Sequence, residues 1–251
     1  MKEHFESAIN YLKSTGIEGC ITGSYFLEFF NDPKQDLDLF VYNEKALTKT
    51  LYTLMGNPMF QLIDPLEKWK CTEYLDKGQS SFRKIGIISV KFKYNLLLDI
   101  NVVLKKEATN IFGVLSTFDF DLVARGWDIP TGQFFSLSDN NTRIMNWNTW
   151  NLSYTKFDIW KVSRLLRQIE RCFKYHNRGY NTDRVIERYI YMINQFLEYE
   201  NIFNSETFEM RLDEYKTNIR NVKKLCELWL KDHNITEEQM NTIKELTKKD
   251  I

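Results

Sequence analysis

The spacing of hydrophobic positions along the chain changes near residue 158, and this change predicts two halves with different architectures. Up to residue 135, short apolar runs alternate with turn residues and short helical repeats, a pattern typical of strands mixed with helices. After residue 157, apolar residues recur every three or four positions over long stretches, which predicts helices. We therefore expect an α+β domain over residues 1–135, followed by a linker and an all-helical domain over residues 136–251.

The first half is expected to contain helices and strands in alternation. Helical spacing predicts helices over 4–14, 25–30 and 44–55. Apolar and β-branched runs predict strands over 19–22, 36–42, 82–92 and 96–103, and a strand–turn–strand unit over 127–135. Because only Lys93, Tyr94 and Asn95 join the third and fourth strands, these two are expected to pair antiparallel.

Three long helices and the start of a fourth are expected in the second half. The long helices cover 158–176, 183–200 and 206–232. The sequence Thr236-Glu237-Glu238-Gln239 predicts a capping box, in which the side chains of the first and last residue bond each other's backbone N–H. This motif marks the start of the fourth helix.

Basic residues step by three or four along the helix that begins at residue 158. They are Lys161, Arg164, Arg167, Arg171, Lys174 and Arg178. The functional interpretation is contact with the phosphates of a nucleotide or a nucleic acid. The alternative is a solvated face opposite the apolar stripe of the helix.

Net charge, apolar runs and cysteine spacing bear on whether the protein binds nucleic acid, spans a membrane or forms disulfides. Lys+Arg and Asp+Glu number 34 each, so the zero net charge does not indicate a strongly basic nucleic-acid binder, although a local basic face is compatible with it. The N-terminus has no apolar signal region, and no run approaches the roughly 18 apolar residues of a membrane span. Three of the four cysteines, Cys20, Cys172 and Cys226, lie among apolar residues, and no CxxC pair occurs. We expect a cytoplasmic protein with buried free thiols and no membrane partner.

Candidate chemistry is concentrated around a glycine-led turn and two acids. Gly23 and Ser24 follow the expected strand 19–22, and Asp36 and Asp38 lie two residues apart on the next strand. Side chains at i and i+2 of a strand share a face, so the two carboxylates lie side by side. Two carboxylates this close repel each other unless they are exposed or a cation lies between them. A glycine-led turn nearby can present backbone N–H groups to phosphate. These parts suit metal-assisted phosphoryl transfer.

A third acid, Asp99, interrupts the apolar run 96–103. An acid within an apolar strand is costly unless it is hydrogen-bonded, paired or metal-bound. If the strands that carry Asp36, Asp38 and Asp99 are neighbours, the three carboxylates converge, as two Mg²⁺ ions with substrate phosphates require. The alternative is that all three are exposed rim residues without a ligand.

In order and context, five residues resemble the pattern of the nucleotidyltransferase superfamily, which includes DNA polymerase β, poly(A) polymerases and CCA-adding enzymes. They are Gly23, Ser24, Asp36, Asp38 and Asp99, and the resemblance covers about residues 17–104. It implies a nucleotidyltransferase fold with a mixed, mostly antiparallel sheet. It also implies that Gly23 and Ser24 hold the triphosphate and that the three acids bind two Mg²⁺ ions, with Asp99 nearest to the acceptor hydroxyl.

A resemblance to CCA-adding enzymes and bacterial poly(A) polymerases extends to about residue 180. The run 118–124 is similar to the motif with which those enzymes read the ribose, which would make Asp119 the ribose contact. Thr117 and Phe118 stand where that motif has paired arginines.

The helix that begins at residue 158 is similar to the neck helix that selects the nucleotide in those enzymes. Asp158 aligns with the selector Asp, whereas Lys161 stands in place of the selector Arg and Phe157 in place of a Glu. A planar Arg and a point-charge Lys read a base edge differently. Asp158, Lys161 and the following Arg164 are the nucleotide-binding residues that this resemblance implies.

The activity implied is transfer of a nucleoside monophosphate from an NTP, in the first place ATP, to a hydroxyl acceptor with release of pyrophosphate. The acceptor implied is an RNA 3′ end, as in terminal addition to tRNA or poly(A)-type tails. Two alternatives stay open. One is a toxin-like nucleotidyltransferase that modifies tRNA or a protein, and the other is a non-catalytic nucleotidyltransferase-like module that binds RNA or a protein.

Overall fold

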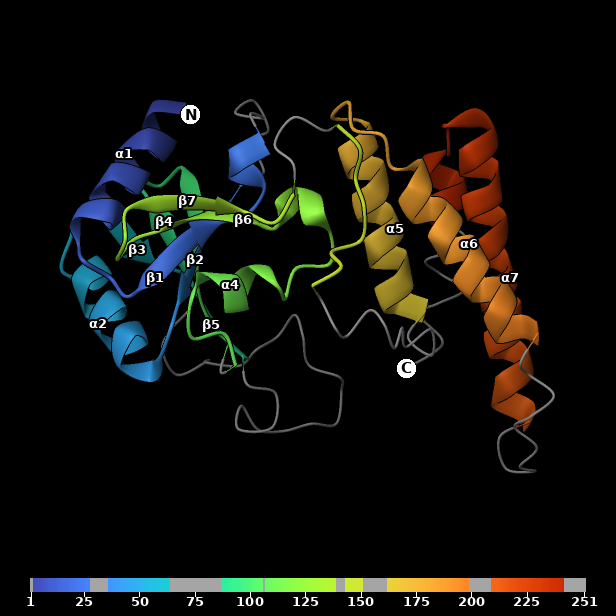
Figure 1. Ribbon diagram of the computed structural model, residues 1–251, viewed down its shortest axis with the longest axis horizontal. Helices are drawn as coiled ribbons and strands as arrows, with labels where there is room; N and C mark the ends of the chain where they lie inside the picture. The colour runs from blue at the N-terminus through green and yellow to red at the C-terminus, as the bar shows by residue number, and fades with distance from the viewer. Residues whose placement is uncertain are drawn as a thin grey trace. The chain divides into compact units, whose positions relative to one another are not determined.

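The chain divides into two compact units, which are considered separately here (Figure 1). The computed structural model describes residues 2–27, 36–63, 87–105, 107–138, 143–150, 162–198 and 209–241. Unit 1 comprises Met1–Asn141 and Asn148–Asn151, and unit 2 comprises Thr142–Trp147 and Leu152–Ile251. Among the helices in these ranges, none combines the length and the apolar character needed to cross a membrane.

Unit 1 is built on a seven-stranded mixed sheet, which confirms the expected α+β class. The strands are β1 (Gly19–Thr22), β2 (Leu37–Val41), β3 (Phe60–Leu62), β4 (Ile87–Tyr94), β5 (Leu98–Lys105), β6 (Arg125–Asp128) and β7 (Gln133–Ser136). Their order across the sheet is β3-β4-β5-β2-β1-β6-β7. Only β2 and β5 pair in parallel, and the other neighbours are antiparallel. The sheet is therefore mostly antiparallel, as expected.

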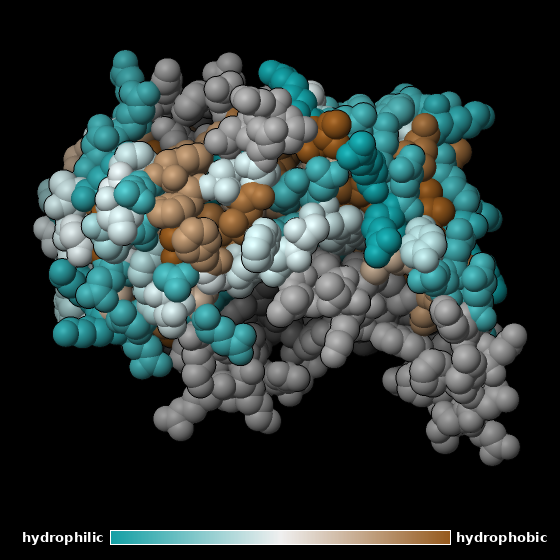
Figure 2. Space-filling model, in the orientation of Figure 1, coloured by the Kyte–Doolittle hydropathy of each residue, from teal (hydrophilic) through white to brown (hydrophobic). Residues whose placement is uncertain are grey.

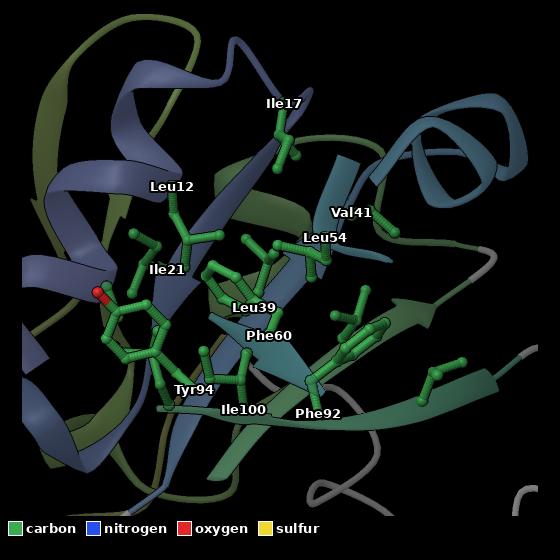
Figure 3. Close-up of a cluster of buried hydrophobic side chains, with 14 of the residues drawn as sticks. Leu12, Ile17, Ile21, Leu39, Val41, Leu54, Phe60, Phe92, Tyr94 and Ile100 are labelled. Atoms are coloured by element: carbon green, nitrogen blue, oxygen red, sulfur yellow. The ribbon is translucent and has the colours of Figure 1, made fainter. Parts of the chain in front are cut away.

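Two helices cover one face of this sheet. They are α1 (Lys2–Ser14) and α2 (Glu44–Met55), and α2 begins where the Asn43 side chain accepts a hydrogen bond from the Ala46 N–H. Figure 3 shows side chains of α1, α2 and the strands converging there, with Leu12, Leu39 and Ile100 fully buried. The odd positions of β2 and the even positions of β5 supply this core because alternate strand residues face the same side.

The short helix α4 (Ile111–Leu115) covers the opposite face. Cys20, Phe40 and Val103 of the central strands pack there against α4. Towards the β7 edge, hydrophobic side chains gather on the surface over β6 and β7 (Figure 2). The rings of Phe112 on α4 and Phe135 on β7 lie 5.2 Å apart. The two faces thus bury different strand positions, and the polar side chains of the site occupy the α4 face near one end of the strands.

A polar cluster around the buried carboxylate of Asp128, beside Cys20, ties the β6–β7 turn to the residue that follows β2. Asp128 accepts hydrogen bonds from the Tyr42 hydroxyl and, at 2.6 Å, from the Thr131 hydroxyl. Burial raises the pKa of the Cys20 thiol to about 12, with a smaller contribution from the Asp128 charge in the same direction. Burial also raises the pKa of Tyr42. The thiol is therefore neutral in the folded protein at ordinary pH.

We expect the free energy of unfolding to fall as the pH rises from about 9 to 12. The unfolded chain loses the Cys20 proton near pH 9, whereas the folded chain keeps it until about pH 12, so high pH favours unfolding. Urea unfolding at intervals over this range measures the effect. The Cys20→Ala variant should show a flatter profile, and a variant profile as steep as that of the native chain would contradict the assignment.

Unit 2 is built from three long helices, α5 (Val162–His176), α6 (Asp183–Glu198) and α7 (Glu209–Asp232). Their apolar stripes meet in a core that includes Ile169, Ile186 and Val222, each fully buried. Beyond α7, Thr236 and Gln239 form the expected capping box, since each backbone N–H donates to the other's side chain.

Several expected boundaries differ from the structure, among them the turn between β4 and β5 and the helix expected over 25–30. The turn between β4 and β5 is formed by residues 95–97 rather than 93–95, because Lys93 and Tyr94 pair with Asp99 and Leu98 in the ladder. Asn95 and Leu96 take the positive φ values that a tight hairpin turn requires. The helix expected over 25–30 is described only as the single-turn η1 (Ser24–Leu27), and residues 28–35 lie outside the described ranges, as do 158–161 of the first long helix.

Candidate functional site

One row of side chains on the α4 face crosses the central strands. Reading from β4 to β6, the residues in register are Lys91, Asn101, Asp38, Thr22 and Gly126. The next row of this face contains Phe40, Cys20 and Val103, which belong to the core. The boundary between polar and apolar rows places Asp38 at the edge of the packed interior, where it is half-buried.

The two acids predicted from the sequence are brought together by Asn101. Its Nδ2 atom donates to Asp36 Oδ2 at 2.8 Å and to Asp38 Oδ1 at 3.0 Å. Asp36 lies just before β2 on the same face as Asp38, and Asn101 faces Asp38 because β2 and β5 run parallel in register. The two carboxylates therefore converge on one point, as expected, but the group at that point is a neutral amide.

Gly23 lets the Asp38 carboxylate approach the turn after β1. Its φ is +100°, a conformation that side-chain-bearing residues rarely adopt. A Cβ atom at this position would lie 3.0 Å from Asp38 Oδ2. The glycine is thus required for its backbone conformation and for the space it leaves to the acid, and it places the start of η1 beside the acid pair.

Asp99 lies on β5 two residues before Asn101, on the same face of the sheet, but its carboxylate is bound to Lys93 rather than to the acid pair. Its Oδ1 atom is 2.8 Å from Lys93 Nζ, directly across the β4–β5 ladder, and its side chain is 60% exposed. Among the residues that the structure describes, no group of three or more His, Cys, Asp or Glu side chains is arranged to hold a metal ion. The expected three-carboxylate centre is therefore not assembled in this arrangement.

Thr22 adds a buried hydroxyl to the same row. The residue is fully buried, and its Oγ1 atom has no hydrogen-bond partner among the described residues. Its methyl group lies on the side of Gly126, since a Cβ atom there would be 2.8 Å from Thr22 Cγ2. An unsatisfied buried hydroxyl is costly, and such groups occur where a water or a ligand completes the bonding.

The other predicted residues of unit 1 lie near the same end of the sheet. Ser24 is half-buried and begins η1, which packs against the single turn η3 (Asp121–Val123). Asp119 precedes η3 and is 7% exposed, and its backbone carbonyl accepts a hydrogen bond from the Asn148 N–H. Asp119 is thus a buried residue of the loop next to η1, and its role as a ribose contact stays a prediction.

The predicted residues of the neck-like helix belong to unit 2. Asp158 and Lys161 lie outside the described residues, and Arg164 lies on α5 with a side chain that the structure does not describe. Their predicted role in nucleotide binding therefore stays a prediction.

Asn101 is the residue that sequence reasoning missed. It follows Asp99 by two positions in an apolar strand, so the same alternation that places Asp36 and Asp38 together also places Asn101 on the face of Asp99. The alternation within residues 98–105 indicated that Asn101 faces the site. Only the parallel register of β2 and β5 shows that Asn101 lies beside Asp38. Lys93 was expected in the turn between the third and fourth strands, and its ion pair with Asp99 follows from the antiparallel register.

Comparison with known proteins adds no family to this description: no family model matches the chain, and no curated protein or solved structure gives a match.

Proposed function

We propose that unit 1 binds an NTP with Mg²⁺ and transfers its nucleoside monophosphate to a hydroxyl acceptor, on a fold of the nucleotidyltransferase type. The observation that carries this proposal is the convergence of Asp36 and Asp38 on one point beside Gly23. A binding site with two carboxylates and room for substrate phosphates is the usual environment of Mg²⁺ in proteins.

The residues present fit one such cation. Asp36 and Asp38 supply two hard oxygen ligands, and the remaining positions belong to water and to phosphate oxygens of the substrate. When bound, the metal neutralises charge on the triphosphate and on the leaving pyrophosphate. A second cation would require Asp99 to leave Lys93, so the two-ion site implied by the resemblance depends on that exchange.

The role of each residue follows from its position. Asp36 and Asp38 would hold the cation, which would bind the triphosphate, and the backbone N–H groups at Gly23 and Ser24 would donate to the phosphates. The acceptor oxygen attacks the α-phosphorus, the bond from that phosphorus to the bridging oxygen breaks, and pyrophosphate and one proton are released. Lys91 and Lys93 lie on the same face as the acids and add positive charge beside the expected position of the phosphates.

An RNA 3′ end is the acceptor that we propose first. Support comes from unit 2, where α5 presents the exposed basic residues Arg167 and Lys174, which suit contact with a phosphate backbone. Modification of tRNA or of a protein side chain, as in a toxin-like nucleotidyltransferase, uses the same acid pair and differs only in the acceptor.

A second candidate function is favoured by the ion pair between Lys93 and Asp99. If this pair persists when nucleotide binds, only two carboxylates face the substrate, and unit 1 would be a nucleotide-binding module without transferase activity. The two functions differ in whether label from an NTP becomes covalently attached to another molecule.

Label transfer tests the proposal. The full chain is incubated with each of the four α-³²P-labelled NTPs and Mg²⁺, first with total RNA and then with a protein lysate. We expect label in one fraction with the native chain and none with the Asp36→Ala/Asp38→Ala variant. The matched control is Glu107→Gln, which neutralises an exposed carboxylate of unit 1 away from the acid pair. Absence of label from every fraction, or equal labelling by the double variant, contradicts the proposal.

A further inference from the structure

We propose that Asn101 is a positioning residue that holds the acid pair together without metal and that its amide must leave the pair when a divalent cation binds. This inference rests on the proposed function, since it assumes that Asp36 and Asp38 are the cation ligands. It concerns the metal-free arrangement, in which one side chain contacts both carboxylates.

The amide of Asn101 occupies the point at which a cation would bridge Asp36 Oδ2 and Asp38 Oδ1. Asn101 Nδ2 lies 2.8 Å and 3.0 Å from one oxygen of each carboxylate, at the point on which the two carboxylates converge. Mg²⁺ binds carboxylate oxygens at about 2.0–2.1 Å, so a cation bound between these same two oxygens requires the space that the –NH₂ group now fills. The two N–H donors satisfy one lone pair on each acid but cancel none of the negative charge.

The backbone beneath Asn101 cannot provide this space. Asn101 lies between Ile100 and Val102, which are both fully buried on the opposite face of β5. Its strand is paired on both sides, with β4 and with β2, so moving the strand would break two ladders. Exchange of amide for cation must therefore occur by rotation of the Asn101 side chain, a change that is available to a half-buried residue.

Asp99 and Thr22 are the polar residues next to the acid pair, Asp99 on β5 and Thr22 on β1. Asp99 is turned to Lys93 and does not contribute to holding the acids in the metal-free form. Thr22, directly across the β1–β2 ladder from Asp38, keeps a buried hydroxyl without a partner among the described residues. Among the described contacts of the acid pair, the Asn101 amide is thus the group that must be displaced, and Thr22 on the other side is a polar group whose bonding is incomplete.

The contacts of Asn101 predict the direction in which its removal changes both cation affinity and stability. Cation binding to the native chain must break two hydrogen bonds to charged groups, and the cost of breaking them reduces the observed affinity. Removing the Asn101 side chain abolishes that cost and, at the same time, destabilises the metal-free state because the paired carboxylates lose their shared donor. A merely structural residue would lower stability without tightening cation binding.

Mn²⁺ binding to the full chain tests the inference. The amount of free Mn²⁺ is followed by electron paramagnetic resonance for the native chain, Asn101→Ala and Asn101→Asp, with thermal unfolding recorded without metal. We expect Asn101→Ala to bind Mn²⁺ about tenfold more tightly and to melt at a lower temperature without metal. Asn101→Asp keeps the side-chain shape, replaces the donor with a third carboxylate, and should bind more tightly still. Asn10→Ala, an exposed position on α1, is the matched control and should neither change Mn²⁺ binding nor lower the melting temperature.

The outcomes separate this inference from the proposed function. Unchanged or weaker Mn²⁺ binding by Asn101→Ala overturns the inference, while loss of binding in Asp36→Asn/Asp38→Asn alone leaves the acid pair as the cation site. If the native chain and both Asn101 variants all fail to bind Mn²⁺, the inference and the proposed metal site are both wrong.

Discussion

Replacing Asp38 with Asn is expected to lower the rate of nucleotidyl transfer about 1000-fold. The reason is that the Asp38 carboxylate would hold a cation that stabilises the charge of the transition state by several kcal/mol, and Asn lacks the charge to hold it. The substitution keeps the volume of the side chain and an oxygen that can accept from Asn101. Asp38 lies in the centre of the polar row and beside Gly23, so its charge acts where the triphosphate is expected. The rate is measured at saturating NTP on the acceptor found by label transfer, with circular dichroism to confirm that the fold is intact.

Asp99 provides the comparison that sharpens this prediction. Because its carboxylate is paired with Lys93 and mostly exposed, Asp99→Asn should lower the rate by about tenfold, the lower end of the range typical of a supporting residue. Glu107→Gln should leave the rate unchanged. A loss in Asp99→Asn as large as that in Asp38→Asn would mean that Asp99 exchanges Lys93 for the substrate complex and that all three acids act together, as the resemblance implies.

Replacing Gly19 with Ala is expected to destabilise unit 1 by about 3 kcal/mol, at the upper end of the usual cost of overpacking. A Cβ atom on Gly19 would lie 2.3 Å from the carbonyl oxygen of Phe40 and 3.3 Å from the Cα atom of Val41. Both obstacles are backbone atoms of β2, and β1 is held on its other side by β6, so relief requires separation of central strands. Because the two units need not unfold together, stability is measured by hydrogen exchange at the amides of β1 and β2.

Gly16 supplies the control for this substitution. It has a φ of +63°, and nothing lies within 4 Å of a Cβ atom placed there. Gly16→Ala should therefore cost about 1 kcal/mol, from backbone strain alone. Equal losses of protection in the two variants would show that the contact with Phe40 is relieved without moving the strands.

The helices and strands of unit 1 were largely predictable because each depends on the pattern of residues within its own segment. The apolar spacing predicted α1 and α2, and the strand–turn–strand pattern over 127–135 predicted the β6–β7 hairpin. The turn between β4 and β5 was misplaced by two residues, since Lys93 and Tyr94 read as turn residues but gain ladder pairs with Asp99 and Leu98. Local composition does not record whether a partner strand extends far enough to keep such residues paired.

The candidate site was predictable in part for the same reason. Period-two alternation was sufficient to place Asp36 beside Asp38, since this depends on one strand alone. Whether Asp99 joins them depends on which residue faces it across β4, and that residue is Lys93. The role of Asn101 depends on the parallel pairing of β2 with β5, two strands that are separated by the whole segment from α2 to β4.

The sequence by itself determined the α+β character of the first half, the helices of the second, and the pair of acids after a glycine-led turn. These features follow from interactions between residues a few positions apart, which leave a periodic pattern in the chain. Only the tertiary structure decided that Asn101 joins the two carboxylates, that Lys93 holds Asp99 apart, and that Thr22 lies buried beside them. Each of these contacts crosses between strands, and the register that creates them is set by packing of the whole sheet rather than by any local pattern.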